Sequence, residues 1–332
     1  MGRNVLLLAL LVSTLTFSST PQSDRRAQEE ARKALTQLEK DYVLLKKGQF
    51  EFEEMFSFTY YSANQIYLES FAILDPVFLT LGKFGIERAR RHIFVNTFSL
   101  RYGILDNLQL DISVPFLYRY DRVSRGESGP EETMERADLG DITVGLSLQP
   151  IRETHTRPAL ILNFGYKSKT GVSPYEIDPK KEVPSGTGYE SLRFGVSTVK
   201  SVDPVVVFGS LSYTHNLHEG VNQTVTGSSG STTIERVYPG GSFTLGVGFA
   251  YALAYNFSLN VQFINNYIMH TFIKTKGGPK TRVPNSSFNT AMLKLGTGWA
   301  VSRSVPLNFS VYLGLTQDSP DYTVEIRIPV KF

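Results

Sequence analysis

Charged side chains recur at every second position of otherwise apolar segments, and they are the residues best able to do chemistry. In a strand, alternate side chains point to opposite faces, so these charges share one face and apolar residues occupy the other. Twelve residues have this spacing: Arg101, Asp111, Arg119, Asp141, Lys167, Arg193, Lys294, Glu325 and Arg327, with Glu51, Glu53 and Lys331 beside them. Seven of the twelve are basic and five are acidic.

This near-balance limits what the charged face can do. A strongly ion-selective filter would show rings of one sign. Mixed signs favour a lattice of ion pairs in which the charged residues neutralise one another. The alternative is that these residues contact a solute directly. Glycines on the same face would ease the curvature of a sheet or leave space beside the charges. They are Gly145, Gly165, Gly195, Gly246, Gly248, Gly296, Gly298 and Gly314.

Metal and catalytic chemistry have little support. His215 and His218 are separated by two residues and followed by Glu219, which gives fewer ligands than a metal site needs. The sequence has no cysteine, so disulfides and thiolate ligands are excluded. No spacing forces a serine and a histidine together. We therefore predict no enzyme activity, no metal site and no cofactor.

The elements that would position the charged face are strands. From Asp321 to Phe332 the chain alternates without a break, with an apolar face that begins at Tyr322 and closes on Phe332. In a soluble sandwich that face would point into the core, whereas in a transmembrane barrel it would face lipid. The aromatic ending resembles the signal by which outer-membrane barrels are recognised, so we assign Tyr322 and Phe332 to it. The expected partner is the barrel assembly machinery.

The same alternation predicts about twelve strands, an even number as in single-chain outer-membrane barrels. They span residues 50–61, 92–102, 108–120, 139–149, 158–168, 189–199, 205–216, 241–251, 257–271, 287–299, 307–315 and 322–332. The connections alternate between short turns and long loops rich in glycine, serine, proline and charge. The long loops are residues 62–91, 121–138, 169–188, 217–240 and 272–286.

Short turns at one end of the strands and long loops at the other match the periplasmic turns and extracellular loops of outer-membrane barrels. An even number of strands then places both termini in the periplasm. Aromatic residues near the strand ends are typical of the girdles at a membrane surface. The sequence therefore predicts an all-β fold, an antiparallel transmembrane β-barrel over residues 49–332, embedded in outer-membrane lipid.

The N-terminal part of the chain has a different character. Residues 1–20 have a charged start, a short apolar run and small residues, as a secretory signal peptide does. Residues 21–48 predict an amphipathic periplasmic helix with one apolar stripe. The stripe consists of Leu35, Leu38, Tyr42 and Leu45. It could plug the barrel or form a coiled coil, in which case the chain would be a homo-oligomer such as a trimer.

The overall charge excludes one class of partner. With 34 basic and 31 acidic residues the net charge is +3, too balanced to indicate nucleic acid. After the predicted signal peptide no run approaches the ~20 apolar residues of a membrane helix.

Several segments carry a family likeness. They are LRYGILDNLQLDISVPFLYR (100–119), LGDITVGLSLQ (139–149), YKSKTG (166–171), DPVVVFGSLSYTHNL (203–217) and the ending LGLTQDSPDYTVEIRIPVKF. In this order they resemble the outer-membrane family named for the MetA pathway of phenol degradation, over about residues 50 to 332. The resemblance implies a transporter for small, aromatic compounds. One branch carries an N-terminal coiled coil and plug and resembles the pore that secretes functional amyloid in pseudomonads.

These observations leave three functions open. The first is a pore or transporter for small solutes, aromatic ones included. The alternative is an export channel for an unfolded or amyloid-forming polypeptide, closed by a helical plug. The third is a structural barrel with a closed lumen. The nine charged candidates from Arg101 to Arg327 would line the lumen in each case.

Overall fold

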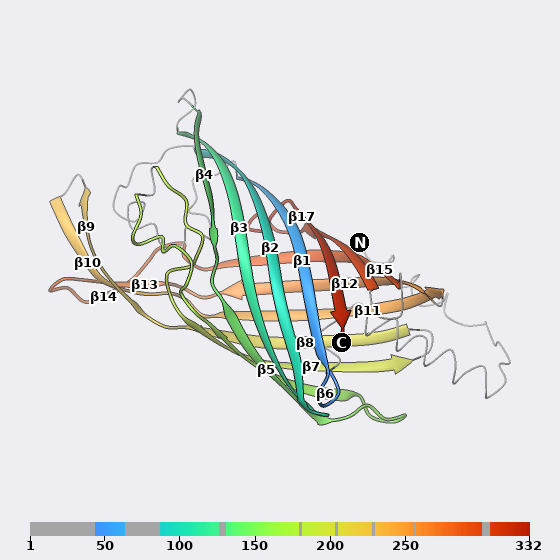
Figure 1. Ribbon diagram of the computed structural model, residues 1–332. Coiled ribbons are helices and arrows are strands. Elements are labelled where there is room, and N and C mark those ends of the chain that lie inside the picture. Colours follow the sequence, from blue (N-terminus) through green and yellow to red (C-terminus); the bar gives the residue numbers. More distant parts are fainter. Residues whose placement is uncertain are drawn as a thin grey trace, which may run out of the picture.

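Alternating segments of the sequence form the strands of one closed antiparallel barrel (Figure 1). The computed structural model describes residues 44–63, 87–125, 131–178, 181–202, 205–227, 230–254, 256–300 and 306–332. Twelve strands make the wall: β1 (Phe50–Ala63), β2 (Glu87–Leu105), β3 (Leu108–Arg125), β5 (Thr143–Ile151), β6 (Ala159–Lys167), β7 (Ser191–Val202), β8 (Val205–Asn216), β11 (Ser242–Ala254), β12 (Phe257–Ile268), β15 (Phe288–Ala300), β16 (Pro306–Gly314) and β17 (Tyr322–Lys331).

The wall closes where the first strand meets the last. β1 pairs with β17 in a register that sets Glu51 opposite Lys331. Beyond the last ladder pair, the Phe332 amide donates to the Phe50 carbonyl at 2.9 Å. On its other side β1 pairs with β2, and β2 pairs with β3, so no strand of the wall is left with an open edge. The predicted count and antiparallel order of the strands are confirmed.

Five further strands lie outside the wall. β4 (Glu131–Leu139) continues the ladder of β3 beyond the barrel. β9 (Glu219–Gly227), β10 (Gly230–Tyr238), β13 (Phe272–Thr275) and β14 (Lys280–Arg282) form a separate sheet, which projects at the left of Figure 1. We expected residues 121–138, 217–240 and 272–286 to be loops, and this was wrong. Their glycine, serine and charged residues are typical of loops. Strands of a hairpin outside the barrel have no continuous buried face, so their sequence need not alternate between apolar and polar residues.

Side chains sort by parity as the alternation predicts. Phe116, Leu211 and Trp299 point outward and are 50%, 54% and 51% exposed, whereas Glu51 points inward and is 1% exposed. A continuous apolar belt of this extent requires hydrocarbon around it. Tyrosines are exposed on the same outer face, among them Tyr118 in the middle of β3 and Tyr267 at the end of β12. No helix in the described ranges is long and apolar enough to cross a bilayer.

The entry into β1 corrects the predicted helix. Leu35, Leu38, Tyr42 and the predicted signal peptide lie outside the described residues, but residues 44–48 are described and are not helical. Gly48 has a φ of 79°, which lets the chain turn into the first strand. Leu45 does not lie on a helical stripe. It is 5% exposed, and its amide donates to the Gln109 side-chain oxygen at 2.9 Å.

Removal of the Phe332 side chain tests whether the terminal aromatic serves assembly more than packing. The side chain is 79% exposed, so it contributes little to the packing of the folded wall. We expect Phe332→Ala to lower the amount of heat-modifiable barrel in membranes several-fold. The barrel that does assemble should unfold at the wild-type temperature. Electrophoresis of heated and unheated membranes measures both quantities, and wild-type yield would remove Phe332 from the assembly signal.

Candidate functional site

The inward side chains surround a cavity of roughly 1210 Å³ inside the barrel. Every strand of the wall contributes to its lining, and so do residues 174, 175, 184–187 and 189 of the loop between β6 and β7. All nine charged residues singled out from the sequence line this cavity: Arg101, Asp111, Arg119, Asp141, Lys167, Arg193, Lys294, Glu325 and Arg327. They differ in what they contact, which divides the cavity into two walls.

One wall is a lattice of paired charges on β17, β1, β2 and β3. Asp121 is 1% exposed and lies between two arginines. Arg119 binds its two carboxylate oxygens with Nε at 3.0 and 3.1 Å and with Nη2 at 2.6 Å. Arg91, opposite Asp121 in the ladder, contacts it with Nε at 3.1 Å. Arg91 and Asp121 were not among the residues predicted from the sequence. They share a strand face with Arg101 on β2 and Arg119 on β3, so the alternation could have identified both.

Two further groups complete the charged wall. Glu51 forms an ion pair with Arg101, and Lys331 approaches the other Glu51 oxygen at 3.7 Å. Glu325 accepts from Arg327 at 2.7 Å and from the Tyr312 hydroxyl at 3.1 Å. Loss of one partner from a buried pair costs about 3–5 kcal/mol because the other charge stays buried. These pairs therefore fix the shape of the wall, as the mixed signs in the sequence favour.

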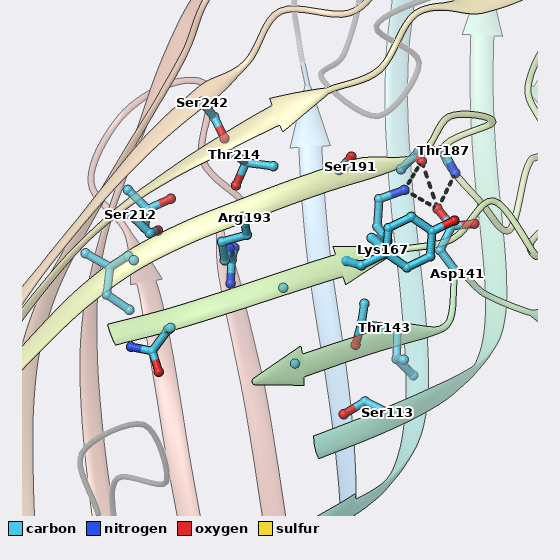
Figure 2. Close-up of a pocket in the computed structure, with 18 of the residues that line it drawn as sticks. Ser113, Asp141, Thr143, Lys167, Thr187, Ser191, Arg193, Ser212, Thr214 and Ser242 are labelled. Atoms are coloured by element: carbon cyan, nitrogen blue, oxygen red, sulfur yellow. Dashed lines mark hydrogen bonds and ion pairs between the residues drawn. The ribbon is translucent and has the colours of Figure 1, made fainter. Parts of the chain in front are cut away.

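Asp141 forms a second cluster, shown in Figure 2, at the end of the barrel where the long connections lie, which we call the outer end. It does not lie on a strand as expected but in the irregular stretch before β5. Its carboxylate accepts from Lys167 Nζ at 2.7 Å, from the Thr187 amide at 2.9 Å and from the Gly171 amide at 3.1 Å. Gly171 and Thr187 belong to the loop between β6 and β7, residues 168–190. One carboxylate therefore fastens this loop into the barrel mouth.

The 168–190 loop also joins the outer strands through apolar contacts. Tyr175 packs with Ile234 and Val237 of β10, and Val183 packs with Val123 and Met134 of β3 and β4. Lys167 Nζ lies 5.0 Å from the centre of the Tyr189 ring. Burial, with a smaller effect of Asp141, raises the pKa of Tyr189 to about 12. The phenol is therefore neutral at physiological pH and presents its ring to the lysine.

The opposite wall carries uncharged polar groups around two cations. Lys294 is 3% exposed and its Nζ lies 5.3 Å from the centre of the Tyr312 ring. Arg193 on β7 is exposed to the cavity. Its inward neighbours on β7 and β8 are serine, threonine and glycine, as Figure 2 shows for Ser191, Ser212 and Thr214.

Buried apolar side chains lie at the short-turn end of the barrel, which we call the inner end. Ala159, Val199, Val206, Phe208 and Ala250 form an apolar cluster near the short-turn ends of β6, β7, β8 and β11. The backbone of residues 45 and 46 lies over Gly103, where a Cβ would meet the Lys46 carbonyl oxygen. A solute that crosses the barrel must pass this inner end.

Histidine positions give no metal centre. His218 stacks on Tyr238 with ring centres 5.5 Å apart, while His215 lies on β8 beside Tyr213. Within the ranges that the structure describes, no three histidine, aspartate or glutamate side chains converge on a point that could hold a metal ion.

Substitution of Asp141 tests the fastening of the 168–190 loop. Asp141→Asn keeps the shape but removes the charge that binds Lys167, which weakens local stability by about 1–3 kcal/mol. We expect roughly tenfold faster tryptic cleavage at loop lysines such as Lys169 and Lys181, because cleavage follows local opening. Glu176→Gln, at an exposed position of the same loop, is the matched control. Equal cleavage in both variants and wild type would show that Asp141 does not hold the loop.

Comparison with known proteins places the fold. No protein-family model matches the sequence. The barrel is similar to the COG4313 outer membrane channel from Pseudomonas putida F1, with a TM-score of 0.59 and 14% identity, covering 88% of this chain and 98% of that chain. The transport unit of the autotransporter AIDA-I from Escherichia coli has a TM-score of 0.46 and 10% identity, covering 95% of this chain and 99% of that one. At these identities the first likeness establishes a shared outer-membrane barrel fold, and the second adds nothing to it.

Proposed function

We propose that this protein is an outer-membrane channel that passes small solutes, with aromatic compounds among them. The observation that carries the proposal is the cavity of roughly 1210 Å³, lined by polar and apolar side chains and enclosed by a barrel with an apolar outer belt. Pockets for small molecules are about 300–1,000 Å³, so this cavity has room for one small organic molecule and water. The resemblance of the strands to the MetA-pathway phenol family supports aromatic solutes as the class.

A polypeptide substrate has less support. An unfolded chain in transit needs a continuous path, and the apolar cluster that contains Ala159 and Phe208 packs near the short-turn ends of the strands along such a path. The alternative keeps one supporting observation, which is that residues 44–49 enter over Gly103 and Gln109 at the inner end of the lumen. A plug formed by residues 21–43 would be well placed there, as in the branch that resembles the amyloid-secretion pore of pseudomonads. The same segment is our candidate for a coiled coil that forms a trimer.

We propose the following cellular arrangement for the barrel. With a signal peptide at residues 1–20, the chain is exported, inserted by the barrel assembly machinery and embedded in outer-membrane lipid. The short turns and both termini face the periplasm, and β4, β9, β10 and the 168–190 loop face outward.

Epitope tags test this orientation. A tag between β3 and β4, at residues 126–130, and another between β9 and β10, at residues 228–229, should bind antibody on intact cells. A tag in the turn between β2 and β3, at residues 106–107, should bind only after permeabilisation. The reverse labelling pattern would invert the orientation.

Deletion of residues 21–43 tests the plug. Because residues 44–49 and the whole wall are kept, the barrel should fold, and single-channel conductance in planar bilayers should increase at least twofold. Chemical cross-linking of both forms would show whether the same segment joins protomers. Equal conductance and equal cross-linking of the intact and deleted proteins would show that the segment is neither a plug nor an oligomer contact. Side chains of the wall or outer loops would then have to close the lumen.

A further inference from the structure

Eight consecutive strands of the wall contain no acidic residue. Among the described residues of β5, β6, β7, β8, β11, β12, β15 and β16 there is no aspartate or glutamate on either face. The inward acids lie instead on β1, β3 and β17 and at Asp141. The side of the cavity formed by these eight strands therefore holds positive charge without a neutralising carboxylate on the strands themselves, which gives it a positive potential.

Arg193 is the exposed cation of this wall. The other cations discussed above have partners: Arg91 and Arg119 bind Asp121, Arg101 binds Glu51, and Lys167 binds Asp141. The Arg193 side chain makes neither an ion pair nor a hydrogen bond with the described part of the chain, and it is exposed within the cavity. Its charge is therefore available to a solute.

The surroundings of Arg193 leave room for a ligand and offer it donors. Across the ladder lie Gly165 on β6 and Thr214 on β8. A Cβ at Gly165 would lie in ordinary contact with the Arg193 Cβ at 3.4 Å, and Gly165 itself places no side chain beside the arginine. In Figure 2 the Arg193 side chain points into the cavity, with Thr214 and Ser212 on the neighbouring strand. Hydroxyl groups can donate to an anion that the guanidinium holds.

We propose that Arg193, with the hydroxyls of Ser212 and Thr214, forms a binding site for the carboxylate of a small organic acid in the lumen. A guanidinium binds a carboxylate through two parallel N–H···O bonds, a geometry that a lysine cannot reproduce. Ile93, Val95 and Leu117, from the charged wall, line the same cavity and supply apolar surface for the rest of the molecule. The inference names a substrate class for the channel and so rests on the proposed function.

The site can be tested by binding without any transport. Isothermal titration of benzoate into the purified full-length protein in detergent should show one site in the wild type. Arg193→Ala should weaken benzoate binding about tenfold to a hundredfold, the range expected when a charge-assisted hydrogen-bonded pair is lost. Arg193→Lys should retain part of the affinity. Arg157→Ala, at an exposed residue of the turn before β6, should bind as the wild type does.

Transport separates failure of this inference from failure of the proposed function. In planar bilayers benzoate should reduce the small-ion current of the wild type and of Arg157→Ala at concentrations that leave Arg193→Ala unaffected. Heat-modifiable mobility on gels will show that each variant is folded. Conduction with equal benzoate affinity in Arg193→Ala and wild type, or no benzoate binding at all, would overturn the carboxylate site. Benzoate binding that depends on Arg193 in a protein that never conducts would instead overturn the channel.

Discussion

The structure depends on one constraint, which is that every backbone amide and carbonyl of the wall must find a partner within the chain. Hydrocarbon offers no hydrogen bonds, and each unpaired group there costs several kcal/mol. The ladder between β1 and β17 meets this requirement by joining residues near the two ends of the barrel, from Glu51 with Lys331 to Tyr60 with Tyr322. Closure then fixes the two faces of every strand, because the register assigns each side chain to lipid or to the lumen.

Buried charge in the lumen follows from the same assignment. The polar residues of each strand have nowhere to point but inward, and a barrel of twelve strands is narrow, so several of these residues lose their water. On β1, β2, β3 and β17 the loss is offset by pairing, as for Asp121 between its two arginines. On the opposite side small and neutral side chains keep the cavity open, and Arg193 retains access to it. The lumen therefore has paired, buried charges on one side, and small polar side chains with an accessible arginine on the other.

Sequence periodicity was enough to predict the strands of the wall, because a period of two is imposed by the membrane on one side and by water on the other. It also placed the nine charged candidates on the cavity side. It could not predict β4, β9, β10, β13 and β14, which lie beyond the membrane and so lack that periodicity. Nor could it show that Leu45 is not helical, because the Leu45 amide donates to the side chain of Gln109, which is distant in the sequence. Pairing partners such as Arg91 and Asp121 depend on register, which a single strand does not reveal.

The two ends of the barrel are held by different combinations of contacts. At the outer end, where the long connections lie, the 168–190 loop is held by hydrogen bonds to Asp141 and also by the apolar contacts of Tyr175 and Val183. Water can replace the hydrogen bonds at small net cost, whereas separation of the apolar contacts exposes surface at about 25 cal/mol per Å². At the inner end, where the short turns lie, Phe208 and its neighbours are buried together and would expose apolar surface on separation. Both ends therefore resist opening through buried apolar surface, and the hydrogen bonds to Asp141 add a further restraint at the outer end.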